Sequence, residues 1–233
     1  MKLPTWDPPE KIVEGIIKAQ LAILSGYRGN PETNRQKFKE AIKPKHVAIS
    51  LSGEPTLYSS IGKLLRLFRR KELTTFLVSN GTVLSILSKL AEEPTQLYIS
   101  VCAPDHATFK QTCRPQISNA WEKLNETLVF LPGFRCPTVM RISLAHGLNM
   151  RNIRGYARLV EKANPTYVEA KAYMHVGFSR LRLRYENMPD HSDVLEFLAQ
   201  VANETGYRIV DESVESRVVL LSRLQKPIRF GNG

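Results

Sequence analysis

Apolar residues recur along this chain in two periods, which predict helices and strands in alternation. Helical spacing first occurs between Asp7 and Gly26, where Ile12, Ile16 and other apolar residues recur every three or four positions. Short apolar runs predict strands at His46–Leu51, Thr74–Ser79, Gln96–Cys102, Thr138–Leu144 and Thr166–Tyr173. Amphipathic patterns predict the intervening helices at Ile61–Phe68, Thr82–Glu93, Ser118–Leu131, Arg151–Ala163 and Ser192–Thr205. Two short strands are expected near Tyr207–Val210 and Arg217–Leu221.

This order of elements predicts an α/β fold with a parallel sheet, because strands that alternate with helices form right-handed crossover units. The length of 233 residues suits a single domain, residues 1–233, and no internal repeat interrupts it. The first helix has no strand before it, whereas each later helix follows one. We therefore expect one strand of the sheet, with its loop, to lie upstream of residue 1.

Polar residues follow several of the predicted strands, at the edge of the sheet where parallel folds bind ligands. The first strand leads into Leu51-Ser52-Gly53-Glu54-Pro55, and the second leads into Ser79-Asn80-Gly81. Gly53 lets the backbone approach a ligand, and Glu54 offers an acceptor for an ammonium group. The alternative is a Gly-Pro turn in which the carboxylate caps a helix.

Composition adds a strong positive charge to this picture. The chain has 33 Lys and Arg residues against 22 Asp and Glu, a formal net charge of +11, with a sequence pI near 9.7. Such an imbalance favours a polyanionic partner such as RNA. A solvated basic face without a ligand is the alternative.

The three cysteines, Cys102, Cys113 and Cys136, match neither a disulfide framework nor the spacing of a metal site, so we expect no metal ligands in this chain. Reduced cysteines indicate a cytoplasmic protein. The first residues, Met1 to Trp6, contain no apolar run typical of a signal peptide, and charges interrupt every long apolar stretch. We therefore expect no membrane association.

Several segments between about Trp6 and Ser222 are together typical of one known family. They are Lys45–Tyr58, Thr75–Thr82, Pro94–Ser100, Cys113-Arg114-Pro115 with Trp121-Glu122, Arg141–Leu144, Gly147–Met150, Glu169–Arg180, Asp211-Glu212-Ser213 and Ser216–Val219. In these segments the chain resembles the radical S-adenosylmethionine enzymes that make tRNA 4-demethylwyosine in wybutosine synthesis, in their archaeal form. The segments Thr95–Tyr98 and Met174–Gly177 distinguish this family from other radical enzymes better than Gly53-Glu54 does.

The resemblance implies a partial (β/α)6 barrel of the radical S-adenosylmethionine type, here without its first strand and cluster loop. It also implies cofactor contacts. Ser52, Gly53 and Glu54 would receive the methionine amino group, and Ser79, Asn80 and Ser100 would lie near the carboxylate and ribose. Arg141 would pair with the methionine carboxylate, a role that its two-pronged guanidinium suits. The backbone of Tyr173 and Met174 would frame the adenine.

The implied reaction condenses two carbons of pyruvate with N1-methylguanosine of tRNA-Phe. A flavodoxin or ferredoxin would supply the electron that cleaves S-adenosylmethionine into a hydrogen-abstracting radical. His175 would act beside the substrate, with a structural histidine as the alternative. Arg180, Arg182 and Arg184 would contact RNA phosphates, or else form a solvated face.

The chain departs from the family pattern where the cluster is concerned. Such enzymes bind a 4Fe–4S cluster through three closely spaced cysteines, and this sequence contains no such triplet. Cys102 stands where the family more often has aspartate, which weakens the inferred ribose contacts, and Leu181 replaces a polar residue. We expect the chain alone to be an inactive part of an enzyme. Two alternatives are a non-catalytic RNA-binding α/β domain and a radical enzyme acting on a small molecule.

Overall fold

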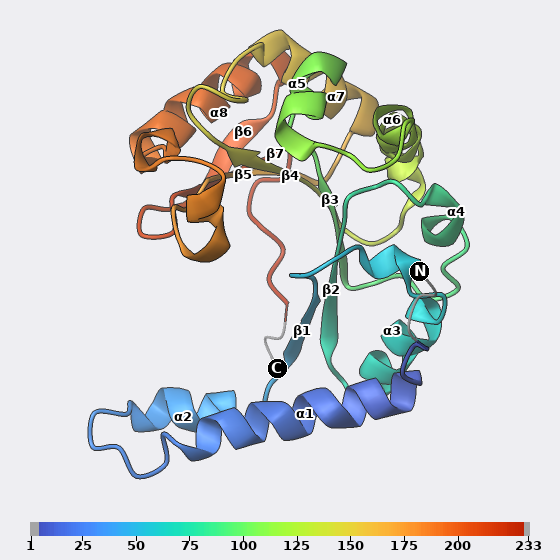
Figure 1. Ribbon diagram of the computed structural model, residues 1–233, viewed down its shortest axis with the longest axis vertical. Helices are drawn as coiled ribbons and strands as arrows, with labels where there is room; N and C mark the ends of the chain where they lie inside the picture. The colour runs from blue at the N-terminus through green and yellow to red at the C-terminus, as the bar shows by residue number, and fades with distance from the viewer. Residues whose placement is uncertain (1–4, 231–233) are drawn as a thin grey trace.

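Five parallel strands pair in chain order, so each strand lies next to the strand that precedes it in the sequence. The strands are β1 (His46–Ile49), β2 (Thr74–Ser79), β3 (Gln96–Ser100), β4 (Thr138–Leu144) and β5 (Tyr167–Ala172). This computed structural model describes residues 5–230. Figure 1 shows the sheet bending between β1 and β5, as in part of a barrel. The predicted α/β class is confirmed, and five of the seven strands form the predicted parallel sheet.

An antiparallel hairpin completes the sheet beyond β5. It consists of β6 (Arg208–Ser213) and β7 (Val218–Ser222), and the strand order is β1-β2-β3-β4-β5-β7-β6. Strand β7 pairs with β5 in the antiparallel sense, from Tyr167 opposite Ser222 to Lys171 opposite Val218. The two short strands expected near the C-terminus are therefore present.

Helices lie along the outside of the bent sheet (Figure 1). The α-helices are α1 (Pro9–Ser25), α2 (Arg35–Ala41), α3 (Ile61–Arg70), α4 (Leu84–Leu87), α5 (His106–Cys113), α6 (Ala120–Phe130), α7 (Ile153–Ala163) and α8 (His191–Thr205). Short 3-10 helices are η1 (Pro55–Leu57), η2 (Leu131–Gly133), η3 (Gly177–Leu181) and η4 (Tyr185–Asn187). Gly206 ends α8 with a positive φ of 69°, as its place after the helix predicts.

Alternation within the strands separates a core from a polar inner face. On β4 the side chains of Met140, Ile142 and Leu144 are fully buried, while Arg141 and Ser143 between them are half-buried. Strand β5 repeats the pattern, with buried valine and alanines alternating with half-buried Glu169 and Lys171. Because neighbouring residues of a strand point to opposite faces, the charged set lies on the concave side of the sheet.

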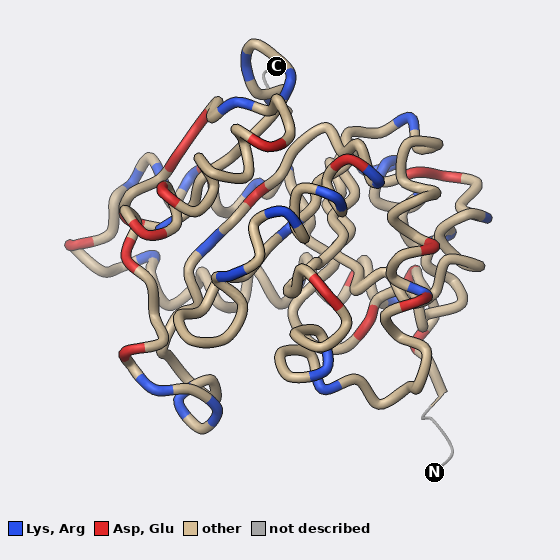
Figure 2. Tube along the Cα trace, turned by 90° about the horizontal axis from the view of Figure 1, so that it is seen from above, with Lys and Arg blue, Asp and Glu red and all other residues tan. Residues whose placement is uncertain are grey.

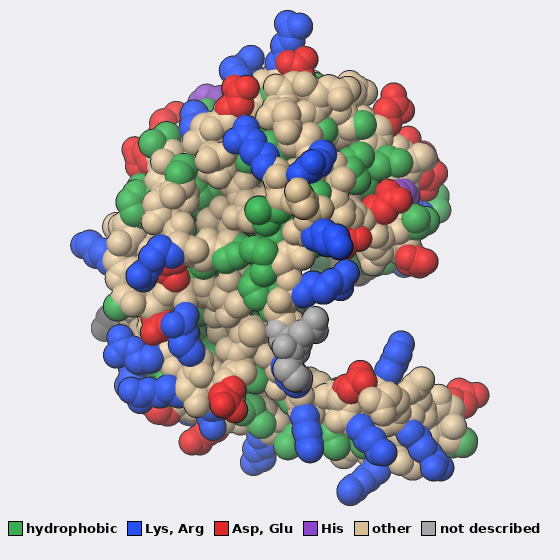
Figure 3. Space-filling model, turned by 180° about the vertical axis from the view of Figure 1, so that it is seen from behind, with side chains coloured by type: hydrophobic (Ala, Val, Ile, Leu, Met, Phe, Trp, Pro, Cys, Tyr) green, Lys and Arg blue, Asp and Glu red, His purple; other side chains and the backbone are tan. Residues whose placement is uncertain are grey.

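Helices α1 and α2 form an arm at one end of the molecule. Figure 1 shows α1 running past the sheet from its contact with α3, and Figure 3 shows a wide gap between the arm and the main body. Several apolar side chains on the arm are exposed, namely Ile16, Leu21, Ile23 and Tyr27. In α1, only Pro9 and Val13 are buried.

Three helices differ from the sequence-based expectation. Helix α2 was not expected because it has no apolar periodicity and buries no residue; Asn34 caps it by accepting from the backbone N–H of Lys37. Helix α5 was also missed. Helix α4 is shorter than the expected Thr82–Glu93, and the end of that segment instead contacts Arg69 and Arg135. Arg69 pairs with Glu92, and the Glu93 carboxylate accepts from the backbone N–H of Arg135.

No helix within residues 5–230 is long and apolar enough to cross a lipid bilayer. The expectation that Met1 to Trp6 contain no signal peptide concerns mainly residues 1–4, which lie outside the described residues, so it stays a prediction.

Candidate functional site

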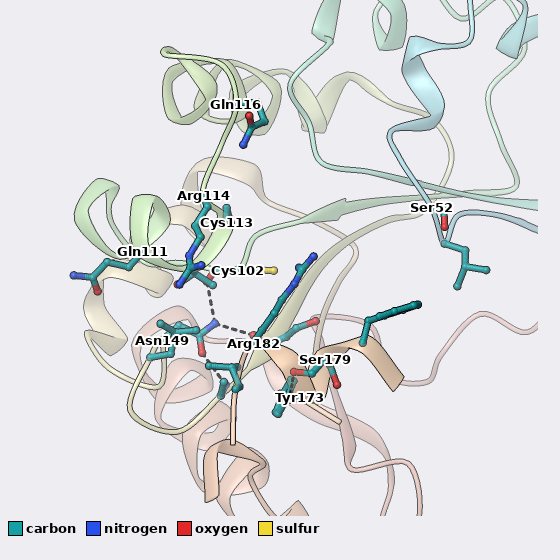
Figure 4. Close-up of a pocket in the computed structure, with 17 residues that line it drawn as sticks. Ser52, Cys102, Gln111, Cys113, Arg114, Gln116, Asn149, Tyr173, Ser179 and Arg182 are labelled. Atoms are coloured by element: carbon teal, nitrogen blue, oxygen red, sulfur yellow. Dashed lines mark hydrogen bonds between the residues drawn. The ribbon is translucent and has the colours of Figure 1, made fainter. Parts of the chain in front are cut away.

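A cavity of about 910 Å³, lined by both polar and apolar residues, lies at the carboxyl ends of β3, β4 and β5. Its size is within the range of roughly 300–1,000 Å³ that is typical of small-molecule sites. Figure 4 shows side chains entering it from several loops. The lining residues are Leu51, Ser52, Cys102, Gln111, Thr112, Cys113, Arg114, Gln116, Ser143, Ala145, Leu148, Asn149, Tyr173, Phe178, Ser179, Arg182 and Leu183. Of the residues predicted to form a site, Ser52, Tyr173 and Arg182 line this cavity.

Asn149 fastens two of the loops that form the cavity. Its side-chain amide donates to the carbonyl oxygens of Cys102 at 2.9 Å and Ser143 at 2.7 Å, and its Oδ1 accepts from the N–H of Ala145 at 2.8 Å. The residue is fully buried. These three bonds fix the ends of β3 and β4 relative to each other. The sequence places Asn149 in a family-like segment but gives no sign of this role.

Tyr173 anchors the long loop after β5. Its backbone N–H donates to the carbonyl of Leu144 at 2.7 Å, which continues the pairing with β4, and its hydroxyl donates to the carbonyl of Ser179 at 3.0 Å. The same hydroxyl lies 3.2 Å from Nδ1 of His175. His175 is half-buried and is not among the residues that line the cavity. Its neighbour Met174 is exposed. Whether either residue contacts a ligand stays a prediction.

Glu54 joins the loops after β1 and β2. Its Oε1 accepts from the N–H and hydroxyl of Thr56 and from the hydroxyl of Ser79, and its Oε2 accepts from the N–H of Asn80 at 2.7 Å. The structure thus brings together three predicted site residues. The carboxylate also caps η1, as the alternative interpretation predicted. Oε2, with one protein donor, retains acceptor capacity for an ammonium group.

The backbone beside Glu54 is unusual at two positions. Leu51 has a φ of 91° and a side chain that is 99% exposed, and Gly53 has a φ of 78°. Positive φ values are accessible to glycine but uncommon for leucine. The turn therefore presents the Ser52 backbone and side chain at the edge of the cavity.

Arg141 lies on the inner face of β4 and is already paired. Its Nε donates to Oε1 of Glu169 at 2.7 Å and its Nη2 to Oε2 at 3.3 Å, while its guanidinium stacks 4.1 Å from the ring centre of Tyr98. Burial, and then the charge of Glu169, raises the pKa of Tyr98. Ser100 is opposite Arg141 in the register of β3 and β4. Neither Arg141 nor Ser100 is among the residues that line the cavity.

The loop after β5 is both basic and apolar at its surface. Arg180, Arg182 and Arg184 are exposed, as are Phe178 at 86% and Leu181 at 82% of their area. Arg180 donates from Nε to the carbonyl of His175 at 3.2 Å. Of the three arginines, only Arg182 lines the cavity.

Basic side chains are spread over the molecule rather than confined to this loop. Figure 2 shows Lys and Arg interspersed with Asp and Glu along the trace, and Figure 3 shows basic groups on both sides of the gap beside the α1–α2 arm. The net charge of +11 therefore favours attraction of a polyanion in general. The distribution of the basic side chains does not identify one face as the binding surface.

Two cysteines meet in the cavity although they are eleven positions apart. The thiol of Cys113 hydrogen-bonds Cys102, which lowers the pKa of Cys102 below that of an ordinary cysteine, and nearby Lys171 contributes in the same direction. The same contact raises the pKa of Cys113. Burial raises the pKa of Cys136, at the other end of the sheet, to about 12. The spacing of the cysteines did not predict this pair.

The described residues do not fit an iron–sulfur cluster. No group of three His, Cys, Asp or Glu side chains within residues 5–230 could hold a metal ion, and the paired thiols are two where three are needed. The cavity volume is suitable for a ligand of the size of S-adenosylmethionine, and Oε2 of Glu54, which lies outside the cavity lining, retains acceptor capacity.

A family model and several related sequences indicate one family for this chain. Residues 162–223 match the family model for wyosine base formation. The S-adenosyl-L-methionine-dependent tRNA 4-demethylwyosine synthase of Pyrococcus abyssi is 49% identical over 94% of this chain and 65% of its own length. The synthase of Methanocaldococcus jannaschii is 39% identical over 98% of this chain and 72% of its own length. The chain thus spans slightly less than two thirds of the Pyrococcus relative.

A solved structure extends the similarity to three dimensions. It is the structure of TYW1 with a lysine–pyruvate adduct bound, which is 39% identical to this chain and superposes with a TM-score of 0.87. The match covers 95% of this chain and 71% of that protein.

Proposed function

Because the chain belongs to the tRNA 4-demethylwyosine synthase family, we propose that it forms the barrel domain that binds the cofactor and the tRNA of such a synthase. The reaction would condense carbons of pyruvate with N1-methylguanosine of tRNA-Phe. The observation that carries this proposal is the cavity at the carboxyl ends of β3, β4 and β5, at the edge of the sheet where parallel α/β folds bind their substrates. Residues 1–233 would act as one domain.

S-adenosylmethionine would occupy the space between the Glu54 loop and the cavity. Ser52, Gly53 and Glu54 would receive its amino group, with Oε2 of Glu54 as the acceptor. Ser79, Asn80 and Ser100 would lie near its carboxylate and ribose, and Tyr173 and Met174 near its adenine. When bound, this cofactor supplies radical chemistry, while the protein positions the reactants and excludes water.

Arg141 would bind the methionine carboxylate while it remains paired with Glu169. A guanidinium has five N–H donors, and Glu169 uses Nε and Nη2. The donors on Nη1 remain for a carboxylate. His175, held by Tyr173, would lie beside the substrate.

The partners follow from the same family membership. Arg180, Arg182 and Arg184 would contact tRNA phosphates, and a flavodoxin or ferredoxin would donate electrons. Pyruvate is the second substrate, by analogy with the lysine–pyruvate adduct of the related structure; no lysine of this chain is assigned to it. A cytoplasmic location suits the three free cysteines.

We expect the 233-residue chain alone to bind both ligands but to form no product, since its described residues do not fit a cluster. Calorimetry with S-adenosylmethionine and gel shifts with tRNA-Phe test the first part. Loss of S-adenosylmethionine binding in Arg141→Gln, with Arg158→Gln as a charge-matched control on α7, would support the assignment. Anaerobic reconstitution with iron and sulfide tests the second part, and one stoichiometric cluster on the chain would contradict it.

A non-catalytic RNA-binding domain is the second candidate. The exposed loop with Phe178, Leu181 and three arginines favours it, because aromatic and basic side chains together bind RNA without catalysis. Tight tRNA binding would support this candidate if S-adenosylmethionine binding remained absent after the chain was combined with the cluster-bearing segment of a relative.

A further inference from the structure

The cavity is lined by cations without any counter-charge. Arg114 and Arg182 are among its lining residues, and none of the described lining residues is Asp or Glu. In the part of the chain that the structure describes, neither guanidinium has a side-chain hydrogen bond or an ion pair. Other arginines near the sheet do have partners, such as Arg141 with Glu169. The cavity thus favours an anion.

Arg114 is held at the cavity by the end of α5. It has a positive φ of 44° and its backbone N–H closes the helix on the carbonyl of Lys110. A left-handed conformation is unfavourable for a residue with a β-carbon, so surrounding structure must impose it. Figure 4 shows the Arg114 side chain directed from α5 toward the cavity wall that Cys102 and Asn149 form.

A hydroxyl without a partner lies in the same wall. Oγ1 of Thr112 is buried and has no hydrogen-bond partner within the described residues, and Thr112 lines the cavity two positions before Arg114. Buried hydroxyls are ordinarily hydrogen-bonded, because an unmade bond costs free energy. A ligand with acceptor oxygens would satisfy this donor.

Arg182 enters from the opposite side, on the loop after β5, and Figure 4 shows its guanidinium extending into the cavity. Phe178, on the same loop and also in the lining, is 86% exposed. An exposed aromatic ring beside free arginines is typical of a site that stacks a base and binds its phosphate. This pairing favours a nucleotide over a small carboxylate.

We propose that Arg114 and Arg182 form a clamp for one RNA phosphodiester inside the cavity, with Thr112 as a further donor and Phe178 as the stacking surface for an adjoining base. The inference rests on the proposed function and assigns residues to one nucleotide of the RNA. Two guanidiniums can each donate two parallel hydrogen bonds to one phosphate. The clamp would hold the backbone beside the reacting nucleotide and would leave the Glu54 loop to the cofactor.

Arginine protection on the unmodified protein tests the clamp. Phenylglyoxal modifies accessible arginines, and peptide mass spectrometry gives the rate at each position, with exposed Arg158 on α7 as the internal control. We expect an anticodon stem-loop RNA to slow modification of Arg114 and Arg182 together and to leave Arg158 unchanged. Pyruvate, S-adenosylmethionine and inorganic phosphate, each without RNA, should protect much less.

The outcomes separate this inference from the proposed function. RNA that binds in a gel shift but leaves Arg114 and Arg182 unprotected overturns the clamp and leaves the proposed function in place. Equal protection by pyruvate or S-adenosylmethionine alone shows a small-carboxylate site and also overturns it. Absence of RNA binding overturns both.

Variants give an independent measurement. Arg114→Gln and Arg182→Gln should each reduce the slope of log Kd against log salt concentration by about 1. The control Arg158→Gln should reduce this slope by less. Arg114→Lys keeps the charge and loses the two-pronged geometry, so it should retain the slope but bind RNA more weakly. Circular dichroism confirms folding of each variant. A slope for Arg114→Gln equal to that of the unmodified protein contradicts the clamp.

Discussion

Arg141 and Glu169 form a two-bond ion pair across neighbouring strands, with Nε to Oε1 at 2.7 Å and Nη2 to Oε2 at 3.3 Å. The side chains are only 24% and 16% exposed. The register of β4 and β5 sets them opposite each other. The arginine expected to bind a carboxylate of the cofactor therefore already binds one of the protein, and that partner fixes the direction of its remaining donors.

Replacing Glu169 with glutamine should destabilise the protein, because it leaves a half-buried guanidinium without its charged acceptor. We expect the free energy of unfolding to fall by about 1–3 kcal/mol. Urea unfolding measures the change, and Glu186→Gln, on the exposed η4 turn, serves as the matched control. A difference between the two variants of less than about 0.5 kcal/mol, the usual range for surface changes, would mean that the pair contributes little.

The sequence predicts the strands better than the loops that they carry. The bounds of β2 and β4 agree to the residue with the expected Thr74–Ser79 and Thr138–Leu144, because apolar runs bounded by polar turns are a local signal. Helix α5 was missed although Asp105 is a favourable N-cap, since its eight residues have little apolar periodicity.

The same distinction applies to the site. Glu54, Ser79 and Asn80 could be grouped because the ends of parallel strands share one edge of a sheet. Asn149, Arg114 and the contact of Cys102 with Cys113 could not be found in this way. Each depends on how two loops pack against each other. The sequence pattern within either loop does not predict that packing.

Asn149→Ala should open the cavity and lower stability. The substitution leaves the carbonyls of Cys102 and Ser143 and the N–H of Ala145 without their buried partner. Each unsatisfied group costs roughly 1–3 kcal/mol, so we expect a loss of at least about 2 kcal/mol in urea unfolding.

Asn149→Asp distinguishes the donors from the acceptor of this side chain. Aspartate keeps an oxygen for the N–H of Ala145 but sets a second oxygen against two carbonyls, so it should be no more stable than the alanine variant. A fully stable aspartate variant would show that the two donated bonds are dispensable.

Asp105 should stabilise the start of α5 in a pH-dependent manner. The backbone N–H of Thr108 donates to its carboxylate at 2.8 Å and lowers its pKa; Asn152 also donates to it at 3.0 Å. A lowered folded-state pKa means that the contribution is complete above the usual Asp value of about 3.9 and is lost as the pH falls through the folded value.

Asp105→Ala should therefore reduce the free energy of unfolding at neutral pH by about 1 kcal/mol, as for other N-caps. The difference from the unmodified protein should shrink in acid. Asp105→Asn keeps a capping oxygen but does not titrate. The free energy of unfolding of this variant should therefore change less between neutral and acidic pH than that of the unsubstituted protein. A difference for Asp105→Ala that grows as the pH falls would reverse the sign and contradict the assignment.

Cys102 should be the most reactive cysteine near neutral pH. The hydrogen bond from Cys113 lowers the pKa of Cys102, the same contact raises the pKa of Cys113, and burial raises that of Cys136. Since the thiolate is the nucleophile, alkylation of Cys102 by iodoacetamide should reach half its limiting rate below the usual cysteine pKa of about 8.5. Peptide mass spectrometry gives the rate at each residue.

Two substitutions at position 113 distinguish the effect of the hydrogen bond on the pKa of Cys102 from the effect of burial. Cys113→Ala removes the donor, so the pH profile of Cys102 alkylation should move to higher pH, because burial then acts unopposed by that bond. Cys113→Ser retains an O–H donor of similar size and should keep the profile closer to that of the unmodified protein. Equal shifts in the two variants would assign the low pKa of Cys102 to its other neighbours, first the backbone of Ser143 and then the charge of Lys171.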